Sequence, residues 1–198
     1  APELEVSQPR IYFGESAESQ EYVVVNSLQE EVDYPLSTEG QSVAYTNYSG
    51  KGGVGIGSFF QRLGFSLRYS ELNLMISNQL SDDSKIIMER NITSRVKKAA
   101  PFLYTDNDPY LALIEGDLFW IIDMYTVSDK YPYAQPADTR RINERSGLPM
   151  SFNYIRNSVK AVVNAYDGTM NFYVFDETDP LIQTYAKIFP TLFSDKSE

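Results

Sequence analysis

Carboxylates are the side chains of this sequence with the greatest capacity for chemistry, because Asp and Glu number 27 while histidine and cysteine are absent. Seven of them stand in three clusters, namely Asp106 with Asp108, Asp117 with Asp123, and Asp176, Glu177 and Asp179. Two carboxylates roughly 5 to 10 Å apart across a cleft can act as general acid and base on a glycosidic bond. A carboxylate-dependent hydrolase acting on glycans is therefore one hypothesis.

Each cluster also has a structural explanation. The segment TDNDPY around Asp106 is typical of a turn, Asp117 falls in a predicted hairpin turn, and DETDP is typical of a helix cap. Calcium binds oxygen ligands, so a calcium-stabilised binding module is another hypothesis, although DNDPY lacks the ligand series and the downstream glutamate of an EF-hand. We favour the structural interpretation, which leaves the catalytic residues unknown and predicts no metal site.

The residue inventory excludes several other kinds of site. Without histidine or cysteine, the chain cannot form a Ser-His-Asp or Cys-His catalytic group or a thiolate zinc site. The 17 Lys and Arg are scattered, the net charge is −10 and the pI is near 4.5, so no nucleic-acid partner is expected. The basic segments RRINER and Lys97-Lys98 are too short to predict binding to membranes or nucleic acids. Trp120 lies in an apolar run and is expected in the core.

The segment NYSGKGGVGIGSFFQR resembles a phosphate-binding loop only in its glycines. Gly50 and Gly55 have the spacing of a P-loop, but Ile56 and Gly57 occupy the positions where Lys and Ser or Thr would meet phosphate and magnesium. Lys51 begins the variant pattern KGGxGK, in which Ile56 again replaces the second lysine. The segment therefore predicts a flexible loop before a helix, and neither a nucleotide nor any other cofactor is expected.

The first helix is predicted from Ser58 to about Arg68. Ser58 and Gln61 match a capping box. Helical spacing predicts one apolar stripe made of Phe60, Leu63, Gly64 and Leu67. The segment ELNLMIS then continues this helix after a break or forms a short second helix.

Two more helices follow from caps and apolar periodicity. One is expected after SDDS, where Asp82 and Asp83 suit a helix N-terminus, and it ends before Pro101. Its predicted apolar stripe is Met88, Ile92, Val96 and Ala99. The last helix has Asp179 as its cap and Pro180 at its first position. Its predicted apolar face is Leu181, Tyr185 and Ile188.

Short β-branched and aromatic runs predict strands in the rest of the chain. QPRIYFGES and QEYVVVN are expected to be strands near the start, whereas residues 27–57 are expected to be mostly loop. YLALIE and LFWIIDMYTVS flank a GD turn, and SVKAVVNAY and TMNFYVFD flank a DG turn, so two antiparallel hairpins are predicted. Between them, residues 128–151 are expected to form a long surface excursion.

Together these elements predict one α+β domain over residues 1–198, with antiparallel β-hairpins in a sheet and several helices packed on it. No run approaches the roughly 18 to 20 apolar residues that span a bilayer. We therefore expect a soluble piece, cut from a longer protein.

Long segments of the chain resemble the large bacterial membrane proteins of uncharacterised protein family 0182. The resemblance rests on AAPFLYTDNDPYLALIEGDLFWIIDMYTVSDKYPY and on NYIRNSVKAVVNAYDGTMNFYVFDETDPLIQTYAKIFPTLF. IYFGE, YVVVN, GKGGVGIGS and RLGFSLRY add to it, and the likeness covers most of residues 9–193. Within these segments Arg156 is expected to clamp a neighbouring loop by charge-assisted hydrogen bonds.

The resemblance implies a multi-pass parent protein in the cell membrane, of which this chain would be an extracytoplasmic part. The family supplies no catalytic or binding residues to carry over. We therefore favour a non-enzymatic module that contributes to assembly, ligand capture or transport, with the rest of its own membrane-embedded chain as partner. One side of its sheet or of its helices is then expected to be exposed.

Overall fold

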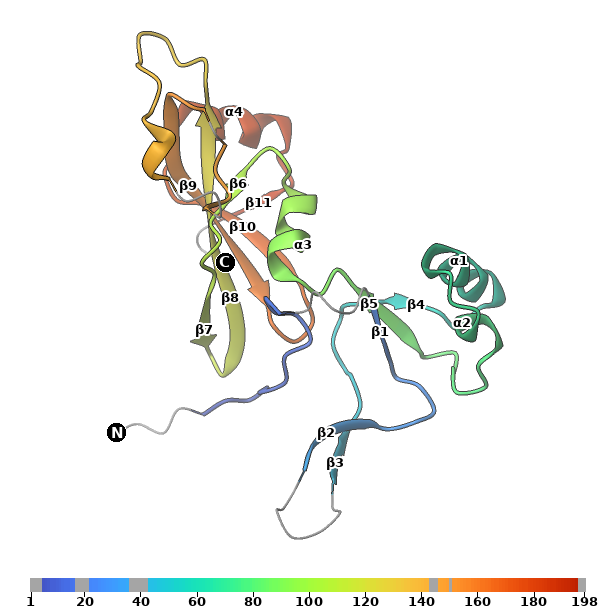
Figure 1. Ribbon diagram of the computed structural model, residues 1–198. Helices are drawn as coiled ribbons and strands as arrows, with labels where there is room; N and C mark the ends of the chain where they lie inside the picture. Colours follow the sequence, from blue (N-terminus) through green and yellow to red (C-terminus); the bar gives the residue numbers. More distant parts are fainter. Residues whose placement is uncertain (1–4, 17–21, 36–42, 143–145, 150, 196–198) are drawn as a thin grey trace. The chain divides into compact units, whose positions relative to one another are not determined.

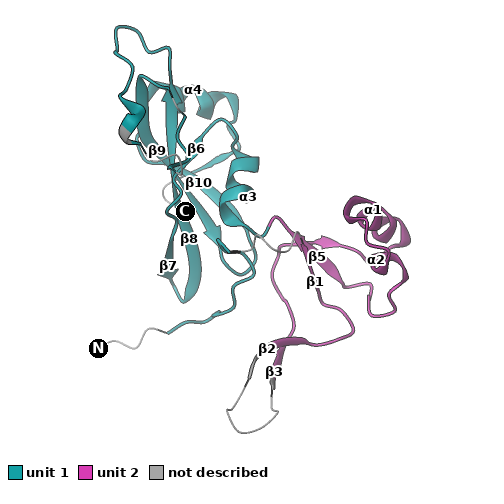
Figure 2. Ribbon diagram, in the orientation of Figure 1, with its two compact units in different colours: residues 1–18, 90–198 teal, residues 19–89 magenta. Residues whose placement is uncertain are grey.

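The computed structural model describes residues 5–16, 22–35, 43–142, 146–149 and 151–195 (Figure 1). Antiparallel sheets and the helices α1 to α4 confirm the predicted α+β class. The chain divides into two compact units, unit 1 with residues 1–18 and 90–198 and unit 2 with residues 19–89 (Figure 2). The expectation of one domain over residues 1–198 stays a prediction.

Unit 1 is built on a sheet with the strand order β11-β10-β9-β8-β6, in which β7 also pairs with β8. The two long strands at its centre are β8, Asp117–Ser128, and β9, Tyr154–Asn164. The shorter strands are β6, Tyr104–Thr105; β7, Tyr110–Ile114; β10, Met170–Val174; and β11, Phe193–Ser194. All of these pairs are antiparallel except β10 with β11.

Both predicted hairpins are present. In the first, Glu115 and Gly116 form the turn between β7 and β8, both with positive φ. Asp117 was expected in this turn, but it is the first residue of β8 and lies opposite Ile114, so that prediction is wrong by one position. In the second hairpin five residues join β9 to β10, and Gly168 has a φ of +71° there.

The two faces of the unit 1 sheet differ in burial, because side chains alternate along each strand. The core face carries the buried residues Ile122, Met124, Val159, Ala161 and Val163. The α-helices in the described part of this unit are α3, Ile92–Ala99, and α4, Pro180–Ile188, and they bury Ile92, Val96 and Ile182. The opposite face, with Ile121, Asp123 and Tyr125, is only partly buried.

Unit 2 contains a sheet of order β1-β5-β4, a two-stranded sheet of β2 and β3, and two helices. Its strands are β1, Tyr22–Val25; β2, Glu31–Pro35; β3, Val43–Thr46; β4, Val54–Gly55; and β5, Lys85–Met88. Its helices are α1, Phe59–Tyr69, and α2, Asn73–Ile76. Ile56, Leu74 and Ile86 form a buried cluster, against which Phe65 and Tyr69 of α1 pack.

The predicted helix starts are confirmed at α1 and α4. Ser58 and Gln61 form the capping box of α1, and Asp179 caps α4 with Pro180 at its first turn. The segment ELNLMIS gives the short helix α2.

One local prediction about unit 2 is incomplete and another is wrong. Residues 27–57, of which 36–42 lie outside the described part, also contain the short strands β2, β3 and β4, because their polar-flanked runs gain backbone partners in the folded chain. The expected helix after SDDS is the strand β5, and α3 begins only at Ile92 with Asn91 as its cap. The reason is that Ile86 and Ile87 are both fully buried, one on each face of the sheet.

The N-terminal segment QPRIYFGES is not a regular strand, which corrects another prediction. It pairs with the rest of unit 1 through isolated β-bridges, such as the one between Gly14 and Asn91. The amides of Tyr12 and Phe13 also donate to the Ala165 carbonyl oxygen. Trp120, expected in the core, is half-buried and donates from Nε1 to the Phe13 carbonyl oxygen at 2.9 Å. It therefore fastens the N-terminal segment to β8.

Candidate functional site

Asp179 is the most deeply buried of the seven candidate carboxylates, with no exposed surface. Its carboxylate accepts hydrogen bonds from the hydroxyls of Thr126, Ser158 and Tyr154, and from the backbone N–H of Leu181. Burial alone would raise the pKa of Asp179, but the bonds from Ser158, Thr126, Tyr154 and the Leu181 amide outweigh burial and lower it. The charged Asp179 carboxylate therefore connects α4 to the β8–β9 pair through hydrogen bonds.

Arg156 clamps the loop that precedes α4, as the sequence predicted. Its Nη1 donates to Asp176 Oδ2 at 3.0 Å and to Thr178 Oγ1 at 2.9 Å. The Thr178 hydroxyl and N–H also donate to Asp176 Oδ1. Asp176 thus accepts bonds within a loop, which is a structural role.

A second group of candidates meets on the partly buried face of the unit 1 sheet. Asp123 on β8 lies opposite Lys160 on β9 and forms an ion pair with its ammonium group. Asp106 Oδ2 accepts a hydrogen bond of 3.1 Å from the Tyr125 hydroxyl, and the Asp106 N–H donates to the Asp123 carbonyl oxygen. The Lys160 ammonium also lies 5.3 Å from the centre of the Phe175 ring. The spacing of Asp106 and Asp123 in the sequence did not predict that they lie close together.

Tyr125 provides a testable pH dependence at this face. Burial, with the Asp106 and Asp123 carboxylates nearby, raises the pKa of Tyr125 to about 12 from the ordinary value of 10.0. Because the folded-state pKa is the higher one, the Tyr125 contribution to stability is present below pH 10 and is lost as the pH rises toward 12. Unfolding measured across this range is expected to show a shallower decline for Tyr125→Phe than for the wild type. An equal decline in both proteins would contradict the raised pKa.

The remaining candidates stand apart from these groups. Asp108 is exposed in the turn before β7, and Asp117 begins β8 beside Gln8 of the N-terminal segment. Of the seven candidates, all in the described part of the chain, only Glu177 lines the pocket beside α4. No group of three or more acidic residues in the described ranges is placed to hold a metal ion.

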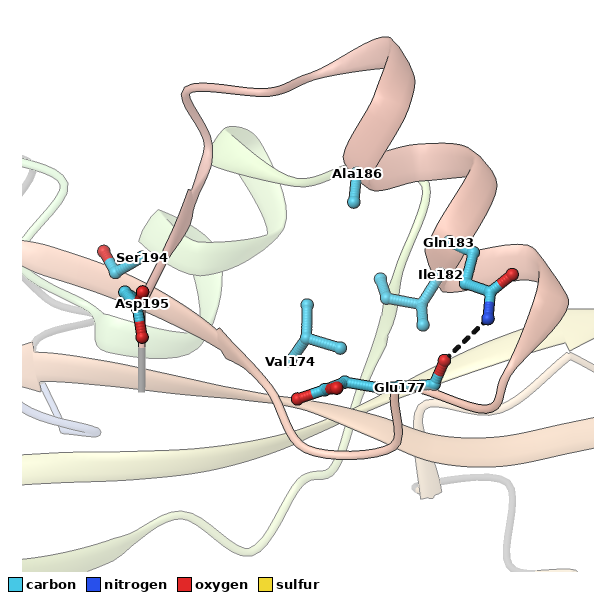
Figure 3. Close-up of a pocket in the computed structure, with 7 residues that line it drawn as sticks. All are labelled: Val174, Glu177, Ile182, Gln183, Ala186, Ser194 and Asp195. Atoms are coloured by element: carbon cyan, nitrogen blue, oxygen red, sulfur yellow. Dashed lines mark hydrogen bonds between the residues drawn. The ribbon is translucent and has the colours of Figure 1, made fainter. Parts of the chain in front are cut away.

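The pocket beside α4 has a volume of about 350 Å³ (Figure 3). Val174, Ile182 and Ala186 supply its apolar lining, and Glu177 and Asp195 bring carboxylates to it. Gln183 Nε2 donates to the Glu177 carbonyl oxygen at 2.8 Å. Asp195 was not singled out in the sequence, because it follows the last strand and no motif marks it. The pocket does not join two of the predicted carboxylates, which the hydrolase hypothesis requires.

The glycine-rich segment contributes a strand and a buried side chain to unit 2. Val54 and Gly55 form β4, and the Ile56 amide donates to the Ser84 carbonyl oxygen. The Ile56 side chain is buried in the core cluster. Gly57 lies against the Asp82 backbone, where a Cβ would come within 2.6 Å of the Asp82 carbonyl oxygen. Ile56 therefore replaces a phosphate-binding lysine with a core residue, and the segment is partly strand rather than a simple loop.

The outer face of α1 consists of Phe59, Phe60, Leu63 and Leu67. At 100° per residue these four side chains fall within about a third of the helix circumference. Helical spacing predicted an apolar stripe of Phe60, Leu63, Gly64 and Leu67, and this stripe does not face the core of unit 2, since Phe60 is 80% exposed and Leu67 is 73% exposed.

The opposite side of α1 packs on the core of unit 2. Arg62 on that side donates to the carbonyl oxygens of Ile56 and Leu80, while Phe65 and Tyr69 pack against the core cluster. Leu72 and Ile76 around α2 are also exposed. A helix that is apolar on both sides is typical of one buried on both sides. The signal available in the sequence was the second apolar stripe, at Phe65 and Tyr69.

None of the helices in the described part of the chain is long and apolar enough to cross a bilayer.

Comparison with known proteins gives a match over the whole chain. The protein-family model with the description "Uncharacterised protein family (UPF0182)" matches residues 1–198. A UPF0182 protein of Trichodesmium erythraeum is 47% identical over 98% of this chain and 21% of the relative. UPF0182 proteins of Desulfitobacterium hafniense and Pelotomaculum thermopropionicum are 47% and 43% identical over 98% and 96% of this chain, and 19% of each relative. No solved structure matches the chain significantly.

Proposed function

Because the chain belongs to the uncharacterised protein family UPF0182 and spans about a fifth of the length of its curated relatives, we propose that it is a non-enzymatic module that binds another part of a larger polypeptide. The parent is a membrane protein and this part lies on its extracytoplasmic side. The outer face of α1 is the contact surface. The membrane and extracytoplasmic parts of the proposal rest on the family resemblance.

The observation that carries the proposal is the exposure of large apolar side chains on α1 and around α2. Exposed contiguous apolar patches on soluble domains are typical of interaction sites. Burying a single Phe or Leu side chain stabilises a contact by about 1.5 to 3 kcal/mol. About four fifths of each curated relative lies outside the matched segment, so a polypeptide partner of suitable length is available in the family.

The non-enzymatic part of the proposal is supported by the roles of the candidate carboxylates. Asp179 and Asp176 hold α4 and its preceding loop, and Asp123 is paired with Lys160. Turnover of any substrate that depends on Asp106, Asp108 or Asp176 would contradict this part.

Photo-crosslinking from the outer face of α1 tests the contact directly. Benzoylphenylalanine replaces Phe60 in the full-length polypeptide that contains this chain, and the same probe replaces Tyr133, which is fully exposed in unit 1, as the matched control. We expect crosslinks from position 60 to peptides outside these 198 residues and none of these from position 133. Crosslinks from position 60 that stay within the chain, reach unrelated proteins or are absent would overturn the proposal.

The location is tested with a single introduced cysteine, since the chain contains none. Tyr133→Cys in the full-length polypeptide is expected to react with a membrane-impermeant maleimide in intact cells, above the background of the unsubstituted protein. Reaction only after cell lysis would place this part on the cytoplasmic side.

A further inference from the structure

The partly buried face of the unit 1 sheet carries aromatic rings across several strands. In an antiparallel pair, residues opposite each other lie on the same face. Tyr104 lies opposite Tyr125, Asp123 opposite Lys160, and Lys160 opposite Tyr173. Tyr110 lies opposite Ile121, which shares the face of Asp123, and Lys160 places its ammonium over the Phe175 ring. We call this surface the aromatic face, formed by Tyr104, Tyr110, Tyr125, Tyr173 and Phe175.

Hydrogen-bonding groups lie among these rings. Asp106, Asp123 and Lys160 are at the face, and Asn157 lies opposite Tyr125. The ring of Phe175 is 58% exposed. The face thus combines exposed apolar rings with carboxylate, amide and ammonium groups.

Contacts within the face restrain several of its side chains before any ligand arrives. The Tyr125 hydroxyl is bound to Asp106, and Lys160 is held by Asp123. Side chains that are already ordered lose less conformational entropy on binding, so such a surface binds with a smaller entropic penalty.

The chemistry of the aromatic face favours a neutral, hydroxyl-rich ligand. Aromatic faces contact the apolar face of a sugar ring, while carboxylate and amide groups bond to its hydroxyls. The two carboxylates against one ammonium, in a chain of net charge −10, disfavour an anionic partner. Four neighbouring strands span roughly 14 Å at about 4.8 Å per spacing, which suits an extended ligand.

We propose that the aromatic face is a non-catalytic binding surface for neutral polysaccharide chains. This inference goes beyond the proposed function and uses residues in unit 1, whereas the outer face of α1 lies in unit 2. The two proposals therefore fail independently of each other.

The test is affinity electrophoresis of this chain through gels that contain hydroxyethyl cellulose, xylan, glucomannan or soluble starch. Retardation is expected in at least one gel, and the four polysaccharides distinguish β-linked from α-linked backbones. Phe175→Ala and Tyr104→Ala are expected to weaken binding about 3- to 10-fold each, the loss of one aromatic contact. Phe60→Ala is the matched control, because Phe60 is exposed on unit 2, and it should bind like the wild type.

Two outcomes would overturn the inference. Unchanged migration in all four gels would show that the aromatic face does not bind neutral glycans and would favour a protein as its ligand. Equal losses in Phe175→Ala and Phe60→Ala would show that retardation is not due to this face. Thermal unfolding of each variant accompanies the gels, because both face residues are exposed and their replacement should leave the fold intact.

Discussion

Replacing Asp179 by alanine is expected to lower the free energy of unfolding of unit 1 by about 3 kcal/mol or more, the effect of removing one partner from a buried charged group. The substitution leaves the buried hydroxyls of Thr126 and Ser158 without their acceptor, and it removes the cap of α4. Chemical denaturation followed by circular dichroism measures the change. We expect α4 to lose its contact with the β8–β9 pair.

Two further variants separate the causes. Asp179→Asn keeps the size of the side chain and one oxygen for the cap, so it should be less damaging than Asp179→Ala. Asp138 is the matched control, because it caps the short 3-10 helix Thr139–Arg141 and bonds to Arg140 but lies at the surface. Asp138→Ala should unfold like the wild type. Similar losses at both aspartates would show that burial of Asp179 is not the cause.

The same carboxylate gives stability a defined pH dependence. The pKa of Asp179 is lowered in the folded chain, so its contribution is present above the ordinary carboxyl range and is lost as the pH falls through the folded value. The wild type should therefore lose more stability on acidification than Asp179→Asn.

Gly168→Ala is expected to lower the free energy of unfolding by about 2 to 5 kcal/mol, the sum of left-handed backbone strain and overpacking. Gly168 has a φ of +71°, and a Cβ there would lie 2.4 Å from the ring of Phe13. That ring is buried, and Arg95 lies over it while donating to the Gly168 carbonyl oxygen. The clash therefore loosens the N-terminal segment, which hydrogen exchange at the Tyr12 and Phe13 amides should detect.

Gly64→Ala is the matched control for this prediction, and the expected change has the opposite sign. Gly64 lies inside α1 with open space around its Cβ position, so alanine should stabilise the helix by about 0.5 to 1 kcal/mol. Destabilisation at both glycines, or at neither, would contradict the assignment of the effect to the Phe13 contact.

The sequence by itself determined the elements whose signals are local. The capping box at Ser58, the cap at Asp179 and the two hairpins all depend on residues within a few positions of one another. The absence of histidine and cysteine likewise excluded whole classes of site without reference to the fold. Resemblance gave the family, which the match over residues 1–198 confirms.

Only the tertiary structure decided which apolar surfaces are buried and which polar groups meet. The stripe of Phe60 and Leu67 has the period of a core-facing helix side, but α1 has a second apolar stripe on its other side. In the folded chain Phe65 and Tyr69 of that second stripe pack against the cluster that contains Ile56, while Phe60 and Leu67 are exposed. The segment after SDDS has a helical pattern but forms the strand β5, because pairing with β1 and β4 buries both of its isoleucines.

Long-range pairing also brings together groups that the sequence places far apart. Tyr125 and Asp106 are 19 positions apart, and Lys160 and Asp123 are 37 positions apart. Their meeting depends on strand register, which is set by the burial of one whole sheet face rather than by any local motif. For the same reason, the sequence showed Asp179 as a helix cap but not as the buried acceptor that fixes α4 to the sheet.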